Sequence, residues 1–280
     1  MSAPLLEVAD LRKAYSVGAT VVQAVDRISF TLAAGGSIGL VGESGSGKTT
    51  TARMLIGLET PDEGSILVDG TPLDLTTRGR AARLQRARAV QIVWQDPYLS
   101  LDPRMKVGAA LDAVLRLHTP LDKAARGARI RVLLDQVGLG PREETSLPRQ
   151  LSGGQRQRVA IARALAVEPR VLVLDEAVSA LDVSVQAQVL NLLDDLRRET
   201  GVGLVFVSHD LAVVRYVCED VMVMRRGVVV EQRPTRDVLA SPEHAYTRLL
   251  LASVPRQGWD LDEISGMHRA ARADDESSRG

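Results

Sequence analysis

The glycine-rich segment at residues 42–49, Gly-Glu-Ser-Gly-Ser-Gly-Lys-Thr, carries the clearest chemical signal in the chain. Glycine lets a backbone wrap so that its N–H groups point inward at phosphate oxygens. The segment follows a continuous apolar stretch, Ser37–Val41, which is typical of a buried strand. A helix is predicted over 49–58, and the positive end of its dipole favours anions. Strand, loop and helix together predict a phosphate-binding loop.

Within this loop we expect Lys48 to bring a full positive charge to the β- and γ-phosphates of a nucleotide, and Thr49 to offer its hydroxyl to Mg²⁺. The alternative is a chance glycine-rich turn, which does not explain the flanking strand and helix. The residues predicted to bind the nucleotide here are Gly42, Glu43, Ser44, Gly45, Ser46, Gly47, Lys48, Thr49 and Thr50.

Two adjacent carboxylates, Asp175 and Glu176, follow four apolar residues at 171–174. Ligands bind at the carboxyl ends of strands in open parallel sheets. We therefore expect Asp175 to hold Mg²⁺ through water and Glu176 to polarise the attacking water. Phosphoryl transfer needs positioning and charge stabilisation more than covalent help. Such a pair is also a common helix start, and taken alone that alternative stays open.

The sequence Leu-Ser-Gly-Gly-Gln at residues 151–155 predicts a second anion-binding helix start. Ser152 is a suitable N-cap, and the two glycines expose backbone N–H groups. Because the chain has one phosphate-binding loop, a second anion site makes sense if it closes on a nucleotide held by a different subunit. A capped helix with a flexible start is the alternative, and it explains the serine and one glycine but not the run.

These residues need a scaffold of alternating strands and helices. Residues 5–32 have the spacing of short antiparallel strands, and Asp69-Gly70 predicts the turn of a hairpin over 65–73. Helices broken by proline and glycine between 96 and 150 indicate an inserted helical subdomain. The other predicted elements are strands at 90–94, 171–174 and 204–207, helices at 152–166, 183–200 and 210–218, and a final hairpin from 221–224 and 228–231. This alternation predicts an α/β fold with a mostly parallel sheet.

Composition argues against several other classes of protein. Among the 280 residues, 35 Lys+Arg balance 35 Asp+Glu, which disfavours a general nucleic-acid binder, so no nucleic-acid partner is expected. A single cysteine, Cys218, excludes a disulfide or an all-cysteine metal site within the chain. No apolar run approaches the ~20 residues that cross a bilayer. Residues 1–10 lack the basic start of a secretory signal, so a cytoplasmic location is expected.

The segment 152–155, with Gln157 and Arg158 behind it, resembles the signature of ABC-type ATPases. The resemblance extends to most of the chain, in the right order. Tyr15 falls where this family stacks an aromatic ring on adenine, Gln95 matches its Q-loop, residues 179–182 match its D-loop and His209 matches its switch histidine. Taken singly, Tyr15 could be a half-buried strand aromatic, Gln95 a turn residue and His209 a neighbour of a helix cap. The order and spacing of the motifs favour the functional interpretation.

The resemblance implies that two ATP molecules lie between two such domains. Each site would combine the phosphate loop of one subunit with the signature of the other, namely Ser152, Gly153, Gly154 and Gln155. Catalytic roles are implied for Glu176, His209, Lys48 and Gln95, and metal-binding roles for Thr49, Gln95 and Asp175. His209 would contact the γ-phosphate, and Gln95 would couple the site to the helical subdomain.

Three segments resemble the oligopeptide/dipeptide permease ATPases, a group that also serves nickel import; they are residues 95–105, 180–190 and 242–250. Many members have Pro-Thr where this chain has Ala177-Val178. We expect this difference to adjust the ATPase activity slightly rather than to abolish it. The implied fold is a P-loop NTPase of ABC type, with an antiparallel β subdomain and the inserted helical subdomain. The implied parts are an ABC ATPase domain over 1–250 with its helical subdomain at about 96–165, an oligopeptide-permease-type extension over 235–256 and a polar tail over 257–280.

The implied function is an ATP-hydrolysing subunit that powers an importer for peptides or a related small solute, by ATP-driven closing of two nucleotide-binding subunits. The implied partners are a second ABC ATPase subunit of a different chain, two membrane-spanning permease subunits and an extracytoplasmic solute-binding protein. The chain would then lie on the cytoplasmic side of the cell membrane as a peripheral protein. A non-transport ATPase of the same type, such as a carbon–phosphorus lyase system component, is the alternative.

Five arginines between residues 78 and 88 are the main charge feature. A solvated helix face is the default interpretation. Contact with membrane subunits or lipid head groups is the alternative.

Overall fold

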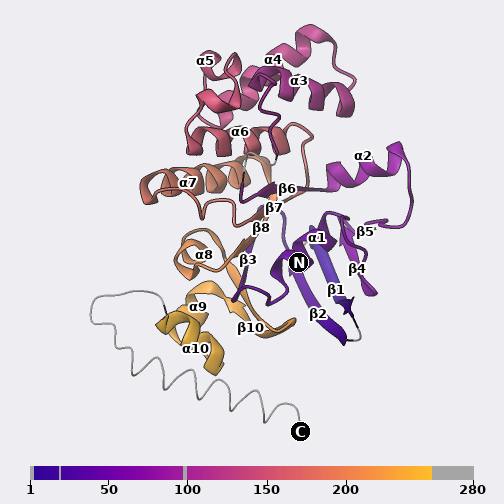
Figure 1. The fold of residues 1–280 in the computed structure, drawn as a ribbon, viewed down its shortest axis with the longest axis vertical. Coiled ribbons are helices and arrows are strands. Elements are labelled where there is room, and N and C mark those ends of the chain that lie inside the picture. The colour runs from indigo at the N-terminus through magenta and orange to yellow at the C-terminus, as the bar shows by residue number, and fades with distance from the viewer. Residues whose placement is uncertain (1–2, 19, 97–99, 254–280) are drawn as a thin grey trace.

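The computed structural model describes residues 3–18, 20–96 and 100–253. Over these residues the chain forms one four-stranded and one six-stranded sheet, with helices packed around them (Figure 1). None of the helices in this part of the chain is both long enough and apolar enough to cross a membrane. The polar tail expected over 257–280, and residues 97–99 of the permease-like segment 95–105, lie outside the described residues.

The smaller sheet is antiparallel and has the strand order β2-β1-β4-β5. On its central strand, Leu6 and Val8 are buried while Glu7 and Ala9 are more exposed, as the alternating pattern predicts. The antiparallel strands predicted over 5–32 and the hairpin around Asp69-Gly70 are confirmed. The strands are β1 (Leu6–Val17), β2 (Thr20–Leu32), β4 (Glu63–Val68) and β5 (Thr71–Pro72).

The larger sheet has the strand order β10-β9-β3-β8-β7-β6. Its strands are parallel except for β10, which pairs antiparallel with β9. Every residue of β3, β7 and β8 is buried, because both faces of the sheet are covered. The carboxyl ends of the parallel strands therefore share one edge. The strands are β3 (Ser37–Val41), β6 (Val90–Trp94), β7 (Val171–Asp175), β8 (Gly203–Ser208), β9 (Asp220–Arg225) and β10 (Val228–Pro234).

Each face of the larger sheet has its own apolar core. On one face α1 (Lys48–Leu55) is packed between the two sheets, with Ala52 and Met54 fully buried beside residues of both. On the other face Leu172 and Phe206 pack against α7 (Val183–Thr200) and the helical subdomain. The helix that begins in the phosphate loop is thus fixed on two sides.

The helical subdomain consists of α3 (Val107–His118), α4 (Lys123–Gln136), α5 (Pro141–Glu144), the 3-10 helix η2 (Pro148–Gln150) and α6 (Gly153–Leu165). In Figure 1 it forms the upper part of the molecule, and α7 lies between it and the sheet. The helices predicted between 96 and 150 are confirmed for the described residues. The predicted break at Pro97 lies outside them.

The arginine-rich segment forms α2 (Arg80–Ala89), a helix without a buried residue. Arg86 donates hydrogen bonds to the carbonyl oxygens of Asp74 and Thr77, and Arg88 donates to that of His118. These contacts fit the solvated helix face that the charge pattern predicts.

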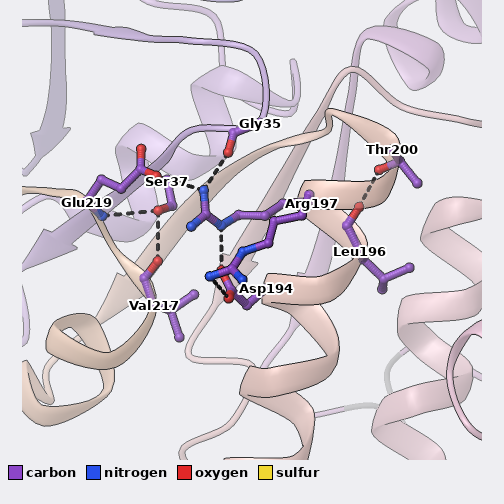
Figure 2. A network of polar contacts seen from close by, with 9 residues as sticks. Gly35, Ser37, Asp194, Leu196, Arg197, Thr200, Val217 and Glu219 are labelled. Carbon is purple, nitrogen blue, oxygen red and sulfur yellow. Dashed lines mark hydrogen bonds and ion pairs between the residues drawn. The ribbon is translucent and has the colours of Figure 1, made fainter.

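A polar network anchors the carboxyl end of α7 (Figure 2). Arg197 donates to the carbonyl oxygen of Gly35 at 2.6 Å and to Oε1 of Glu219 at 2.9 Å, and it pairs with Asp194 at 2.7 Å. Ser37 donates to the carbonyl oxygen of Val217 at 2.8 Å. The network joins α7 to the start of β3 and to the end of α8 (Leu211–Val217). Strand β3 leads into the phosphate loop, and α8 follows His209.

The structure differs from the sequence prediction at the end of the first helix and after the last strand. The first helix ends at Leu55 rather than at 58, because Gly57 adopts a left-handed backbone with φ of 72° that ends the helix. After the last strand the chain forms two helices that the sequence did not predict, α9 (Thr235–Ala240) and α10 (Ala245–Ala252).

Candidate functional site

The phosphate loop, residues 42–49, is held in one shape by glycines that no other residue could replace without strain. A Cβ at Gly42 would lie 2.2 Å from the carbonyl oxygen of Met224, and a Cβ at Gly47 would lie 2.3 Å from that of Ala24. Both glycines also have positive φ, at 154° and 103°. The backbone can therefore fold back on itself here, as a cradle for an anion requires.

Lys48 lies inside this loop and is only 5% exposed. Its Nζ donates hydrogen bonds to the carbonyl oxygens of Gly42 at 2.7 Å and Glu43 at 2.8 Å. Burial lowers the pKa of the ammonium group, and the carboxylates of Glu176, Asp175 and Glu43 partly oppose that shift. Among the described residues Lys48 forms no ion pair, so its charge is available to a phosphate.

Asp175 ends β7 next to this loop and is 7% exposed. Burial raises the pKa of its carboxyl group, and so does the charge of Glu176, while Arg53 and Lys48 act in the opposite direction. A buried carboxylate that repels its neighbour is stabilised when a cation binds. Asp175 is therefore suited to a divalent metal ion.

Glu176 has a left-handed backbone, with φ of 49°, which is uncommon outside glycine. Its N–H donates to the carbonyl oxygen of Val207 at 2.9 Å, and its own carbonyl oxygen accepts the hydroxyl proton of Ser179 at 2.9 Å. Such strain persists where the surroundings fix it, and it is concentrated at functional sites. Here it sets the direction in which the Glu176 side chain leaves the end of the sheet.

His209 follows β8 and lies beside Glu176, with Nδ1 3.2 Å from Oε1. The side chain of His209 is 58% exposed, whereas that of Glu176 is 26% exposed. The next residue, Asp210, caps α8 by accepting from the N–H of Ala212 at 2.7 Å. The cap fixes the chain direction after β8 and leaves the imidazole facing the carboxylate.

Ser152 and Gln155 form a reciprocal cap at the start of α6. The N–H of Gln155 donates to Oγ of Ser152 at 3.2 Å, and the N–H of Ser152 donates to Oε1 of Gln155 at 2.9 Å. Gly154 is buried, and a Cβ there would lie 2.3 Å from Cγ1 of Val185 on α7. At Gly153, by contrast, the nearest atom lies at 3.8 Å. The cap agrees with the capped-helix interpretation, and the close contact of Gly154 with Val185 is a packing role that the sequence did not predict. The second anion site stays a prediction.

The remaining predicted residues lie at the edges of the site. Gln95 is exposed and follows β6, whose last residue, Trp94, pairs with Asp175 in the sheet. Tyr15 is half-buried on β1, and the ammonium of Lys13 lies 5.7 Å from its ring centroid.

The structure therefore brings one group of predicted residues together and leaves another apart. Lys48, Asp175 and Glu176 influence one another electrostatically, and His209 contacts Glu176. Within the described residues, no hydrogen bond or ion pair joins the segment 152–155 to the phosphate loop. The chain thus presents a loop site and a separate capped helix start.

One hydrogen bond to the phosphate loop was not predicted from the sequence. The N–H of Glu43 donates to the hydroxyl oxygen of Tyr246 on α10, at 2.9 Å. Tyr246 lies within the permease-like segment 242–250, but a single tyrosine more than 200 residues from the loop carries no local signal of this contact.

Comparison with protein-family models finds two matches. Residues 25–179 match the model described as ABC transporter, and residues 230–279 match the model described as oligopeptide/dipeptide transporter, C-terminal region.

Two of the curated proteins similar to this chain are named as import ATP-binding proteins. The glutathione import ATP-binding protein GsiA of Salmonella typhi is 48% identical over 234 residues, which is 84% of this chain and 37% of that protein. The putative peptide import ATP-binding protein BOV_A0347 of Brucella ovis is 46% identical over 252 residues, which is 90% of this chain and 79% of that protein. The chain therefore spans little more than a third of the length of the first relative.

Among solved structures, the dimeric post-hydrolysis state of the ATP-binding cassette MJ0796, bound to ADP and Pi, superposes with a TM-score of 0.73. That chain is 28% identical, and the match covers 82% of this chain and 99% of the other. The fold described above is therefore the fold of that cassette.

Proposed function

Because the chain belongs to the ABC transporter family, we propose that it is the ATP-binding and ATP-hydrolysing subunit of an importer for peptides or a related small solute. The observation that carries this proposal is the meeting of Lys48, Asp175, Glu176 and His209 at one edge of the larger sheet. The names of the relatives and the match to the C-terminal region of peptide transporters support a peptide as the solute.

ATP binding follows from the loop. The N–H groups at the start of α1 and the dipole of that helix would attract the phosphates, and the buried ammonium of Lys48 adds a full charge. Lys48 would keep its carbonyl partners, Gly42 and Glu43, and turn its third donor, which now meets Oγ of Ser46 at 3.4 Å, toward a phosphate oxygen. Tyr15 would stack on the adenine ring. Little rearrangement is needed, because the glycines already fix the cradle.

A Mg²⁺ ion fits the oxygen groups at the loop. Thr49 at the start of α1 and Asp175 at the end of β7 would hold it, with Gln95 nearby, and the buried Asp175 would gain most from a cation. Bound there, Mg²⁺ supplies charge neutralisation for the phosphates.

Hydrolysis requires a water molecule to be positioned and polarised. Glu176, strained and directed by its backbone contacts, would accept the proton of that water. His209, 3.2 Å from Glu176, would hold the carboxylate in place and reach the γ-phosphate.

The separate helix start completes the site from another subunit. Ser152, Gly153, Gly154 and Gln155 lie apart from the loop of their own chain. The reciprocal cap uses the N–H groups of Ser152 and Gln155, so the N–H groups of Gly153 and Gly154 are the ones this helix start would offer to a phosphate. Facing the loop of a second subunit, they would close over the ATP, and hydrolysis would let the two subunits separate.

The wider assembly is part of the same proposal. A second ATPase subunit of a different chain, two membrane-spanning permease subunits and an extracytoplasmic solute-binding protein complete the importer. The chain would lie peripherally on the cytoplasmic side of the membrane, where the helical subdomain contacts the permease and Gln95 links that contact to the site. The extension over 235–256 is proposed as a part specific to this transporter group.

The substitution Ser152→Arg tests the shared site. We expect ATP hydrolysis to fall by at least about a hundredfold, because a bulky cation displaces the helix start from the phosphates. ATP affinity of the monomer, measured by titration calorimetry, should stay unchanged. The control Asp122→Arg removes the N-cap of α4 in the same subdomain and introduces the same side chain. If Ser152→Arg lowered the ATP affinity of the monomer by as large a factor as it lowers ATP hydrolysis, the proposal would be contradicted.

A further inference from the structure

The C-terminal helix α10 contacts the phosphate loop through one buried side chain. Tyr246 is 1% exposed, and its hydroxyl oxygen accepts a hydrogen bond from the N–H of Glu43 at 2.9 Å. No other tyrosine in the described part of the chain bonds to this loop. The contact joins positions that lie 203 residues apart in sequence.

The same peptide group also binds the lysine. The N–H of Glu43 and the carbonyl of Gly42 belong to one planar peptide unit. Its N–H meets Tyr246, and its oxygen accepts a proton from Nζ of Lys48 at 2.7 Å. Because the unit is planar, the hydroxyl that fixes the N–H direction also fixes the carbonyl that holds Lys48. Hydrogen bonds at both ends of one amide also polarise each other.

Tyr246 is itself held firmly. The guanidinium of Arg225, the last residue of β9, lies 4.7 Å from the centroid of the Tyr246 ring. His244 caps α10 by accepting from the N–H of Tyr246 at 3.1 Å. The buried carboxylate of Glu231 on β10 accepts from the N–H groups of Glu243 and His244, at 3.0 and 3.1 Å. The hydroxyl therefore has a fixed position relative to the larger sheet.

We propose that Tyr246 is a positioning residue for Lys48, through the Gly42–Glu43 peptide, and that α10 thereby tunes the affinity of the phosphate loop for ATP. The proposal rests on the proposed function of the loop, and it adds a C-terminal helix to the determinants of nucleotide binding. Whatever moves α10 would change how strongly the loop holds phosphate.

Removal of the hydroxyl would leave the N–H of Glu43 without its partner. The loop could recover a hydrogen bond only by turning that peptide toward water, which turns the Gly42 carbonyl away from Lys48. One hydrogen bond of this kind corresponds to roughly a threefold to tenfold change in an equilibrium constant. The chemical step does not use Tyr246, so the maximal rate should change little.

The variant Tyr246→Phe tests this coupling while it keeps the ring and its stacking on Arg225. Hydrogen–deuterium exchange of the nucleotide-free chain should be faster at residues 42–46 than in wild type. KM for ATP should rise threefold to tenfold, with kcat changed by less than about twofold. The control Tyr216→Phe removes a hydroxyl that donates to Asn191 on α7 rather than to the loop, and it should match wild type in both measurements.

The outcomes separate the two proposals. Faster exchange with a raised KM supports the positioning role. Unchanged exchange at residues 42–46 and an unchanged KM in Tyr246→Phe would overturn it, even if the chain hydrolyses ATP. A wild-type chain that binds no ATP would refute the proposed function instead, and in that case the tuning of ATP affinity falls with it. A fall in kcat at constant KM would also contradict the positioning role.

Discussion

At the scale of single residues, the site depends on two groups whose positions cost free energy. Glu176 has a left-handed backbone, and Lys48 is an ammonium group placed where burial lowers its pKa. Both arrangements persist because the ends of β3, β7 and β8 fix them. The cost at Lys48 falls once a phosphate is bound, since the phosphate offsets the buried charge of its ammonium group.

The substitution Glu176→Gln should leave ATP binding nearly unchanged and slow hydrolysis by roughly a hundredfold to ten-thousandfold, the usual contribution of a general base. The amide keeps the shape of the side chain but cannot accept the proton of water. Steady-state phosphate release and ATP titration measure the two effects, and Glu199→Gln on the exposed end of α7 is the matched control. Wild-type turnover in Glu176→Gln would remove Glu176 from this role.

The residues of the loop site could be predicted from the sequence because each motif carries its own chemistry. Lys48 follows a glycine run, and Glu176 follows an apolar strand, so a short window is enough. Tyr246 could not be predicted in this way. Its contact with Glu43 depends on how β9, β10 and α10 fold back onto the loop, which no local pattern encodes.

At the scale of elements, the packing of α6 against α7 depends on glycine, which has no side chain, at position 154. A Cβ at Gly154 would lie 2.3 Å from Val185, a β-branched residue with little freedom to turn away. At Gly153, one position earlier, there is room. Tight packing, as well as exposed N–H groups, therefore explains the glycine pair.

The substitution Gly154→Ala should lower the free energy of unfolding by about 1–3 kcal/mol, the usual cost of overpacking. Gly153→Ala should cost less than about 0.5 kcal/mol, since alanine favours the first turn of a helix more than glycine does. Urea unfolding followed by circular dichroism measures both. Equal losses in the two variants would show that the contact with Val185 does not constrain α6.

The docking of α10 should depend on pH through Glu231. Burial opposes ionisation of this carboxyl group, yet the hydrogen bonds it accepts lower its pKa to about 2, from 4.5 in an unfolded chain. A lowered pKa stabilises the fold above pH 4.5, and this contribution is lost as the pH falls toward 2. Glu231→Gln should therefore reduce stability at neutral pH by about 2 kcal/mol.

Below pH 4.5 the stability difference between wild type and Glu231→Gln should shrink, as thermal unfolding at several pH values would record. The exposed Glu199→Gln serves as the control. A difference that is constant between pH 7 and pH 3 would contradict the assigned role of the Glu231 carboxylate.

At the scale of the whole molecule, the sequence predicts the elements better than their arrangement. The alternation of strands and helices predicts a parallel sheet, and the sheet is confirmed. The order β10-β9-β3-β8-β7-β6 could not be predicted, because strands distant in sequence pair there. The hairpin at 221–231 was expected, but not that β9 joins β3 in parallel. Pairing of this kind is decided by the burial of both sheet faces rather than by any local pattern.

Under the proposed function, one molecule supplies only part of each working site. Its loop, carboxylates and histidine meet at one edge, while its capped helix start at Ser152 lies elsewhere. The dimeric cassette with the same fold is consistent with two chains completing each other. The central claim is therefore that two subunits, rather than one, form each working site.

ATP turnover per chain, measured over a wide dilution series with the oligomeric state recorded in parallel, tests this claim most directly. The account predicts that turnover per chain rises with concentration as subunits associate and is close to zero where the chain is strictly monomeric. Full turnover by a strictly monomeric chain, with no dependence on concentration, would contradict it.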